Sequence, residues 1–275
     1  MTKHNHHYVK TLEQSLTAAF GWKAIAEWRD KLIAEVQSKA QRLGISEEAY
    51  CHSAIASPAE LQTLAELVSN NETRFFREVE QMNALQRQVI PQLLDLRQKT
   101  RTLTIWSVAA STGEEVYSVA MIVKEMLPED WRVKLLASDF RGQTIIQATK
   151  GRYPASSLTF VETRLREKYF TPAEQNGREP SFDIVRDIKS LVAFRRANLC
   201  DAHFWKSLQQ RFDLILCNNL LLHFHPLAVK KTVERMAGAL ESGGFLTVTK
   251  KEAMFVDHAD LKAERALAGA FYKKL

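Results

Sequence analysis

Short apolar runs alternate with amphipathic stretches from residue 103 onward, and this alternation constrains the fold more than any other feature of the chain. Apolar runs of strand length with few polar residues are typical of strands buried on both faces of a sheet. Amphipathic stretches between them are typical of the helical crossovers that parallel strands require. The pattern therefore predicts an α/β fold with a parallel sheet covered by helices. Its segments are 103–109, 114–126, 133–138, 144–150, 214–217 and 244–249.

The first 72 residues carry a helical pattern instead. Trp28, Leu32 and Val36 recur at spacings of four, and a second periodic stretch covers residues 61–67. We therefore expect an all-α N-terminal domain over residues 1–72.

The remaining residues, 73–275, are expected to form the second domain, which begins with a linker helix over 79–96. Residues 158–197 interrupt its alternating pattern with an Asn-Gly turn signal at 176–177 and an alternating apolar run at 184–194. These signals predict a small antiparallel β insertion over about 158–197.

Composition excludes several classes of protein. The chain is 45% hydrophobic and 25% charged, and no apolar run approaches the roughly 18 residues of a membrane span. Cys51, Cys200 and Cys217 are widely spaced and form no C-x-x-C pair, so neither a disulfide framework nor a metal site is expected. No secretory signal is visible at the start of the chain, and we expect a cytoplasmic location.

The net charge of +6 suits an acidic partner, such as nucleic acid, a membrane surface or a glutamate-rich protein. No RNP-type aromatic run, zinc finger or dense block of lysine and arginine accompanies this charge. We therefore expect no nucleic-acid partner and no membrane insertion.

A turn of sequence Ala110-Ser-Thr-Gly113 follows the first predicted strand. Ligands of open α/β sheets bind beyond the carboxyl ends of the strands, so Ala110 lies where a nucleoside cofactor is expected. The turn lacks the G-x-G-x-x-G pattern, which disfavours a dinucleotide. Asp139 ends the second predicted strand 26 residues after Gly113 (139 − 113). In related folds, an acidic side chain about 20 residues further on binds the ribose hydroxyls.

A polar segment with arginine, Asn71-Glu-Thr-Arg-Phe-Phe-Arg-Glu78, precedes this region. Asn71, Thr73 and Arg77 are spaced by two and four residues, which at the start of a helix directs three hydrogen-bonding groups at one ligand. The alternative is that Arg77 is an exposed helical residue paired with Glu78 or Glu80, where it contributes at most about 0.5 kcal/mol.

Together, these segments resemble the CheR family of S-adenosylmethionine-dependent methyltransferases, which esterify glutamate side chains of chemotaxis receptors. The resemblance covers residues from about 70 to 250, and further similar segments follow in the same order as in the family. These segments are Leu136-Ala-Ser-Asp139, Gly151-Arg-Tyr-Pro154, Val192-Ala-Phe-Arg-Arg-Ala-Asn-Leu199, Phe212-Asp-Leu-Ile-Leu-Cys-Asn-Asn-Leu-Leu-Leu-His-Phe224 and Leu240-Glu-Ser-Gly-Gly-Phe245. An ordered set of this kind is far more specific than a single motif.

The resemblance implies a Rossmann-like methyltransferase fold with a small antiparallel β insertion and an all-α N-terminal domain. It implies S-adenosylmethionine as cofactor, S-adenosylhomocysteine as product, and a receptor or related signalling protein with acidic methylation sites as partner. In some family members the β insertion docks a receptor tail by strand addition.

The resemblance also assigns roles to individual residues. Glu115 suits a charge-assisted hydrogen bond to the cationic groups of the cofactor, whereas by position alone it would only complement a helix dipole. By the same resemblance, Asn71, Thr73 and Arg77 contact the cofactor or the reacting carboxylate. Asn198 and Leu199 flank the adenine, and Asn219 lines the site.

Two positions depart from the family pattern. Family members usually read Arg-Asn-x-x-x-Tyr-Phe where this chain has Asn218 and His223 in place of the arginine and the tyrosine. A glutamate carboxylate is already a nucleophile at neutral pH, so no general acid or base is obligatory. Arg77 and His223 are then expected to be the catalytic residues that hold the acceptor in line with the methyl group.

Two alternatives to this function stay open. The departures at Asn218 and His223 fit a catalytically weak or inactive cofactor-binding scaffold or sensor. The predicted helix at 28–42 has its basic residues diluted by acidic ones, where the family carries a strongly basic helix, and this fits a methyltransferase with a different acceptor.

A further departure from the family pattern lies after the late strand, where Val248-Thr-Lys-Lys-Glu252 replaces the family's Gly-His-Ser-Glu.

Overall fold

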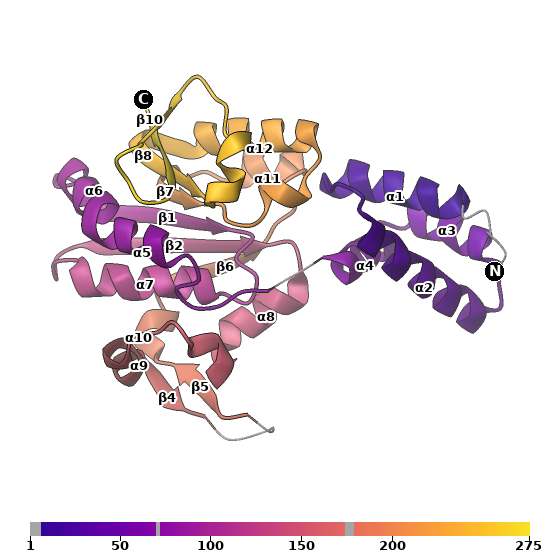
Figure 1. The fold of residues 1–275 in the computed structure, drawn as a ribbon, viewed down its shortest axis with the longest axis horizontal. Coiled ribbons are helices and arrows are strands. Elements are labelled where there is room, and N and C mark those ends of the chain that lie inside the picture. Colours follow the sequence, from indigo (N-terminus) through magenta and orange to yellow (C-terminus); the bar gives the residue numbers. More distant parts are fainter. Residues whose placement is uncertain (1–6, 70–71, 174–178) are drawn as a thin grey trace.

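Four helices form a bundle at the N-terminal side of the computed structural model, which describes residues 7–69, 72–173 and 179–275 (Figure 1). They are α1 (His7–Phe20), α2 (Ala26–Leu43), α3 (Glu47–Ala56) and α4 (Pro58–Val68). Leu12, Leu32 and Leu64 are fully buried between them. Gly44, at φ 66°, ends α2, and the hydroxyl of Ser57 accepts a hydrogen bond from the first turn of α4. Local turn chemistry therefore sets the ends of these helices.

A seven-stranded sheet forms the centre of the second body, in the order β6-β2-β1-β7-β8-β10-β9. β10 is antiparallel to both of its neighbours, and the other neighbouring pairs are parallel. The chain builds outward from β1 through β2 to β6 and then crosses to β7, so the order reverses between β1 and β7. This is the point at which doubly wound sheets bind ligands. The strands are β1 (Thr102–Val108), β2 (Arg132–Asp139), β6 (Val192–Arg196), β7 (Phe212–Leu216), β8 (Leu240–Val248), β9 (Leu261–Ala263) and β10 (Ala270–Lys274).

Helices cover both faces of this sheet, as the alternating sequence pattern predicts (Figure 1). Leu103 and Ile105 of β1 belong to the core beneath α5 to α7, whereas Trp106 and Val108 belong to the core shared with α11 and α12. The covering elements are α5 (Val79–Ala84), a π-helical turn (Leu85–Val89), α6 (Ile90–Leu96), α7 (Glu114–Met126), α8 (Gly142–Lys150), α11 (Ala202–Ser207) and α12 (Pro226–Ala239). The fold is a Rossmann-like α/β fold.

A second, three-stranded antiparallel sheet has the order β3-β5-β4. Its elements are β3 (Arg152–Pro154), a 3-10 turn (Ala155–Leu158), α9 (Thr163–Tyr169), β4 (Phe170–Pro172), β5 (Ser181–Ile184) and α10 (Arg186–Lys189). The bounds of 158–197 expected for the insertion are therefore wrong at both ends, because β3 precedes them and residues 192–196 form β6 of the main sheet. Alternation reveals a half-buried strand without revealing its partner.

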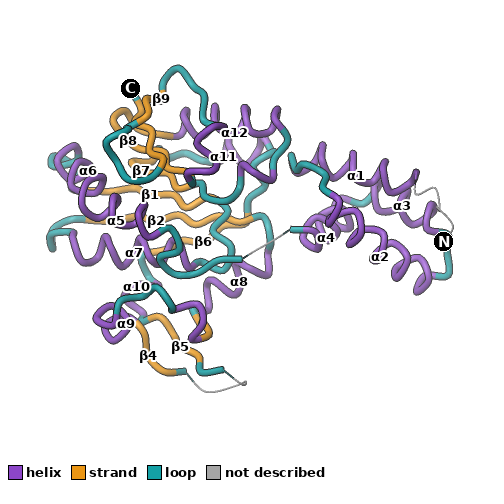
Figure 2. The backbone as a smooth tube through the Cα atoms, viewed as in Figure 1, coloured by secondary structure: helices purple, strands orange, loops and turns teal. Residues whose placement is uncertain are grey.

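The helical bundle meets the main sheet through the segment that follows α1. Trp22 and Phe224 form an isolated antiparallel bridge, the amide of Lys23 donates to the carbonyl of His223 (2.7 Å), and the amide of His225 donates to the carbonyl of Gly21 (2.9 Å). The bundle and the loops that face it are visible in Figure 2. A pocket lies at this junction. Within the described residues, no helix is both long and apolar enough to cross a membrane.

Candidate active site

The loop between β1 and α7 has an unusual backbone. Ala109, Ser111 and Gly113 all have positive φ values, of 54°, 50° and 94°. Non-glycine residues in this region cost about 1–3 kcal/mol each and are concentrated at functional sites. A Cβ atom on Gly113 would lie 3.2 Å from the hydroxyl of Tyr153, so glycine also relieves a close contact. In this backbone conformation Ala110 lines the pocket, and the amide of Ala110 donates to the carbonyl of Ser138 (2.9 Å).

Asp139 ends β2 and faces this loop. Its Oδ2 accepts from the amide of Ser111 (2.9 Å), and its Oδ1 accepts from the amide of Arg141 (2.9 Å) and the hydroxyl of Thr144 (3.2 Å). Burial raises the pKa of the Asp139 carboxyl, and these hydrogen bonds oppose the rise. Asp139 therefore joins two loops at the carboxyl ends of neighbouring strands while it lines the pocket.

Glu115, in the first turn of α7, has neutral donors on both oxygens. Its Oε1 accepts from the hydroxyl of Ser107 (2.7 Å), and its Oε2 accepts from the side-chain amide of Asn218 (2.7 Å). Burial raises the pKa of Glu115 most, and the nearby carboxylates of Glu252 and Glu78 raise it further. Within the described residues no cation forms an ion pair with it. A desolvated carboxylate of this kind suits a cationic ligand.

Thr73 and Arg77 lie on either side of a turn at Phe75 and Phe76, and the expected helix start at this segment is wrong, because α5 begins only at Val79. Phe75 is fully buried, and Phe76 has a φ of 53° with its amide donating to the hydroxyl of Ser118 (3.0 Å). The buried Phe75 and the left-handed Phe76 reverse the chain, so helical spacing does not apply. Both Thr73 and Arg77 still line the pocket.

Arg77 is exposed at the pocket, and its Nη1 donates to the carbonyl of Glu72 (2.6 Å). The alternative pairing with Glu80 is not observed, because Glu80 instead forms an ion pair with Lys250. Within the part of the chain that the structure describes, Arg77 is therefore held by a backbone carbonyl, and its other donors face the pocket without an ion-pair partner.

Asn198 and Leu199 follow β6 and line the same pocket. The side-chain amide of Asn198 donates to the carbonyl of Ala19 (2.9 Å), and its Oδ1 accepts from the amide of Cys200 (2.9 Å). Asn198 thus ties the end of α1 to the main sheet. Leu199 is buried and offers an apolar surface.

Glu252 supports the loop that carries Asn219 and His223, and sequence reasoning missed this residue. Its fully buried carboxylate accepts from the amides of Asn219 (2.8 Å) and Leu221 (2.7 Å) and from the hydroxyl of Thr249 (2.7 Å). Thr249 and Glu252 form a capping box, and the T-x-x-E spacing is the sequence signal that could have found it. Glu252 thereby positions two predicted site residues without lining the pocket itself.

Replacing Glu252 with alanine is expected to lower the free energy of unfolding by about 2–5 kcal/mol, because the buried amide of Leu221 and the half-buried amide of Asn219 lose their acceptor. Urea denaturation measures this change. Glu234→Ala, at an exposed position of α12, is the matched control and is expected to change stability by less than about 0.5 kcal/mol. Equal stabilities of the two variants would contradict the role assigned to Glu252.

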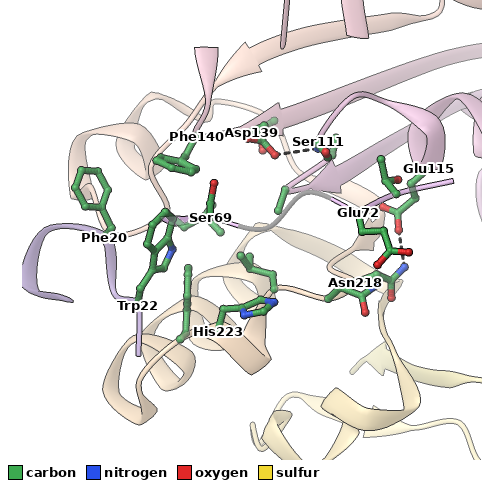
Figure 3. Close-up of a pocket in the computed structure, with 18 of the residues that line it drawn as sticks. Phe20, Trp22, Ser69, Glu72, Ser111, Glu115, Asp139, Phe140, Asn218 and His223 are labelled. Carbon is green, nitrogen blue, oxygen red and sulfur yellow. Dashed lines mark hydrogen bonds between the residues drawn. The ribbon is translucent and has the colours of Figure 1, made fainter. Parts of the chain in front are cut away.

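Aromatic side chains form one end of the pocket, and the sequence pattern did not predict them. Trp22 packs edge-on against Phe140, with ring centroids 4.8 Å apart, and Phe20 lies 5.8 Å from Phe140. Figure 3 shows this aromatic end, an opposite end with Glu115 and Asn218, and the Asp139–Ser111 hydrogen bond between the two. The pocket therefore combines a flat apolar end, a central carboxylate and an acidic end.

The nine predicted site residues that the structure describes all line this one pocket: Thr73, Arg77, Ala110, Glu115, Asp139, Asn198, Leu199, Asn219 and His223. Asn71 lies outside the described residues. The fold thus brings together residues from five separate segments of the chain.

The fold and this pocket define a class of protein. A Rossmann-like sheet with a pocket at its switch point is the arrangement of nucleoside-cofactor enzymes. The cofactor turn has no glycine-rich cradle for a pyrophosphate, whereas Glu115 offers a carboxylate to a cation. These features fit the S-adenosylmethionine-dependent methyltransferases, because that cofactor combines an adenosine part with cationic groups.

The comparisons with known proteins identify the family. The family model "CheR methyltransferase, SAM binding domain" matches residues 71–268. The chain is 33% identical to the probable chemotaxis protein methyltransferase of Rhizobium etli, over 74% of this chain and 76% of that protein. It is 34% identical to chemotaxis protein methyltransferase 2 of Pseudomonas aeruginosa, over 74% and 70% of the two chains. The protein belongs to the CheR methyltransferase family.

A crystal structure of TrmN from Thermus thermophilus is a much more distant match, with 14% identity, a TM-score of 0.38, and coverage of 73% of this chain and 53% of that one. The family assignment rests on the sequence relatives and the family model. The protein is therefore an S-adenosylmethionine-dependent methyltransferase. Because the named relatives are methyltransferases, the alternatives of an inactive scaffold and of a different acceptor are not favoured.

Proposed function

We propose that the protein transfers a methyl group from S-adenosylmethionine to a glutamate side chain of a chemotaxis receptor or related signalling protein in the cytoplasm. The product on the acceptor is a methyl ester. The observation that carries the proposal is that one pocket holds two carboxylates, Asp139 and the desolvated Glu115, and that Glu115 has no ion-pair partner among the described residues. The relatives named as chemotaxis protein methyltransferases suggest the class of acceptor.

In this proposal, each part of the pocket holds one part of the cofactor. Asp139 accepts from the ribose hydroxyls, and Glu115 accepts from the ammonium group. The apolar end, including Leu199, lies against the adenine. The remaining cofactor-binding residues in the proposal are Asn71, Thr73, Arg77, Ala110, Asn198 and Asn219.

Arg77 and His223 are proposed to hold the acceptor. Bound S-adenosylmethionine supplies an electrophilic methyl group on a sulfonium. An acceptor carboxylate needs no base at neutral pH, so the task of the protein is alignment, which contributes up to roughly 7–11 kcal/mol. Arg74 is paired with Glu72 (3.2 Å), whereas among the described residues Arg77 is bonded to a backbone carbonyl and to no carboxylate, so Arg77 is the cation proposed to orient the acceptor carboxylate. His223, exposed in the pocket wall, is proposed to donate a second hydrogen bond.

Transfer of a labelled methyl group to the cytoplasmic fragment of a chemotaxis receptor tests the function. The expected product releases its label as methanol in alkali, because carboxyl methyl esters hydrolyse in base. Arg77→Ala is expected to lower kcat by about a hundredfold through loss of alignment. Arg101→Ala, at an exposed arginine paired with Asp130, is the matched control and should leave kcat unchanged. A base-stable label, or no label on any receptor fragment, would overturn the proposal.

We further propose that residues 1–72 and 73–275 are two domains, and that the three-stranded sheet docks an extended segment of the acceptor protein. The support for docking is that, among the described residues, β3 and β4 each pair only with β5, which leaves each with an open edge. Open strand edges bind extended peptides by strand addition.

A further inference from the structure

Two buried side-chain amides face each other behind the acidic end of the pocket. Gln81, in α5, donates from Nε2 to Oδ1 of Asn218 (3.1 Å), and Asn218 donates from Nδ2 to Oε1 of Gln81 (2.8 Å). Both residues are buried. Asn218 lines the pocket, and Gln81 does not.

The neighbours of Gln81 determine which way its amide faces. Nε2 of Gln81 also lies within hydrogen-bonding distance of the carbonyl of Val248 (3.0 Å) and Oγ1 of Thr247 (2.7 Å), so its two hydrogens are shared among three acceptors. The hydroxyl of Thr247 uses its own hydrogen on the carbonyl of Ala270 (3.0 Å), so towards Gln81 it can only accept. Both neighbours therefore require the NH2 group of Gln81, and its Oε1 is left to face Asn218.

The orientation of Gln81 in turn determines the orientation of Asn218. Nδ2 of Asn218 donates to Gln81 and to Oε2 of Glu115 (2.7 Å). With the amide of Asn218 reversed, its Oδ1 would face both Oε1 of Gln81 and the Glu115 carboxylate, and acceptors would oppose each other at two contacts. Gln81 therefore ensures that Glu115 meets a donor on this side.

The amide pair is also uncharged. Asn218, held by Gln81, satisfies one oxygen of Glu115 without neutralising its charge. The hydroxyl of Ser107 does the same for the other oxygen. The charge of Glu115 therefore stays available to a cationic ligand, and the carboxylate is held between two fixed donors.

We propose that Gln81 is a positioning residue for the ammonium group of the cofactor, acting through Asn218 on Glu115. Gln81 does not touch the ligand. It holds the Asn218 donor on Glu115, which keeps the free lone pairs of that carboxylate directed into the pocket. This inference rests on the proposed function, in which Glu115 binds the ammonium group.

Two ligands separate this role from a structural one. S-adenosylhomocysteine carries the ammonium group, whereas 5′-methylthioadenosine has the adenosine part and no amino-acid part. Gln81→Met removes the amide and keeps the side-chain length. It is expected to weaken S-adenosylhomocysteine about tenfold, the size of coupling seen between residues in one hydrogen-bond network, and to leave the affinity for methylthioadenosine unchanged. Calorimetric titration of the full chain measures both affinities.

Two controls accompany this variant. Gln88→Met makes the same chemical change at an exposed position of the π-helical turn after α5 and should alter neither affinity. In a Glu115→Gln background, Gln81→Met should have no further effect on S-adenosylhomocysteine, because the residue through which Gln81 acts has lost its charge. Should Gln81→Met fail to fold, Thr247→Val removes an acceptor that orients Gln81 and is expected to produce the same selective loss.

The outcomes separate this inference from the proposed function. Wild-type protein that binds neither ligand overturns both. Wild-type protein that binds S-adenosylhomocysteine through Glu115, with a Gln81→Met variant that binds it equally well, overturns only the role of Gln81. An equal loss for both ligands overturns that role as well, because it indicates general damage to the pocket.

Discussion

Asp139→Ala is expected to weaken cofactor binding severely and to destabilise the protein at the same time. The carboxylate is the acceptor for two backbone amides, those of Ser111 and Arg141, and loss of a buried acceptor costs about 1–3 kcal/mol for each donor. If it also accepts from ribose hydroxyls, the loss of these charge-assisted hydrogen bonds weakens binding by more than about a hundredfold. Because both ligands contain ribose, S-adenosylhomocysteine and methylthioadenosine should be affected alike.

Calorimetric titration and urea denaturation measure the two effects of Asp139→Ala separately. Thr144→Val is the matched control, since it removes a hydroxyl whose hydrogen is shared between Oδ1 of Asp139 (3.2 Å) and the carbonyl of Arg141 (2.8 Å), and it leaves the carboxylate in place. It is expected to lower stability and keep cofactor affinity. An Asp139→Ala variant that binds S-adenosylhomocysteine as tightly as the wild type would exclude Asp139 from cofactor binding.

Glu115→Gln is expected to weaken S-adenosylhomocysteine by about ten- to a hundredfold while leaving methylthioadenosine unaffected. A charge-assisted hydrogen bond contributes about 1.5–3 kcal/mol, and glutamine cannot supply the charge. Glutamine fits the site, because its oxygen can accept from Asn218 and its NH2 group can donate to the hydroxyl of Ser107. The variant without ligand should be at least as stable as the wild type at neutral pH, since it removes a desolvated charge.

The pH dependence follows from the direction of the pKa shift. Burial raises the pKa of Glu115 above its ordinary value of 4.5, so the folded protein without ligand binds this proton more tightly than the unfolded chain does. The stability that the protonated Glu115 side chain contributes is therefore complete below pH 4.5, and it is lost as the pH rises through the raised pKa of the folded protein. Binding of an ammonium group needs the ionised form, so cofactor affinity should rise over the same interval. Burial also raises the pKa of Asp139, which faces the same pocket.

Titration with S-adenosylhomocysteine between about pH 5 and 8 isolates the contribution of Glu115, because the rise in affinity should be smaller in Glu115→Gln than in the wild type. Glu114→Gln is the matched control: Glu114 is the neighbouring residue, is buried and has a raised pKa, but it lies outside the pocket. It should bind the cofactor as the wild type does. Identical pH profiles for wild type and Glu115→Gln would contradict the role of Glu115.

Position relative to strand ends was the sequence signal that worked best for the site. Ala110 and Asp139 follow or end apolar runs, and the carboxyl ends of parallel strands necessarily meet at one edge of the sheet. Resemblance to the family added Glu115, Thr73 and Arg77, although the helical geometry expected for Thr73 and Arg77 was wrong. The buried Phe75 and the left-handed Phe76, not helical periodicity, decide how that segment turns.

The residues that sequence reasoning missed depend on contacts between distant segments. Gln81 and Asn218 are separated by 137 positions, and Gln81 and Thr247 by 166. Trp22 reaches the pocket only because its segment pairs with the backbone at Phe224. No local pattern marks such residues, since each is an ordinary polar or aromatic side chain within its own element. Glu252 is the exception, because its capping box is local.

The sequence by itself determined the alternation of strands and helices, the ends of helices marked by Gly44 and Ser57, and the residues at the carboxyl ends of β1 and β2. These features depend on local periodicity and turn chemistry, which act over a few residues. Only the tertiary structure decided that residues 192–196 join the main sheet and that Gln81 orients Asn218 beside Glu115. Strand partners and buried hydrogen-bond networks are chosen by long-range packing, because a buried polar group must find its partner wherever the fold brings one.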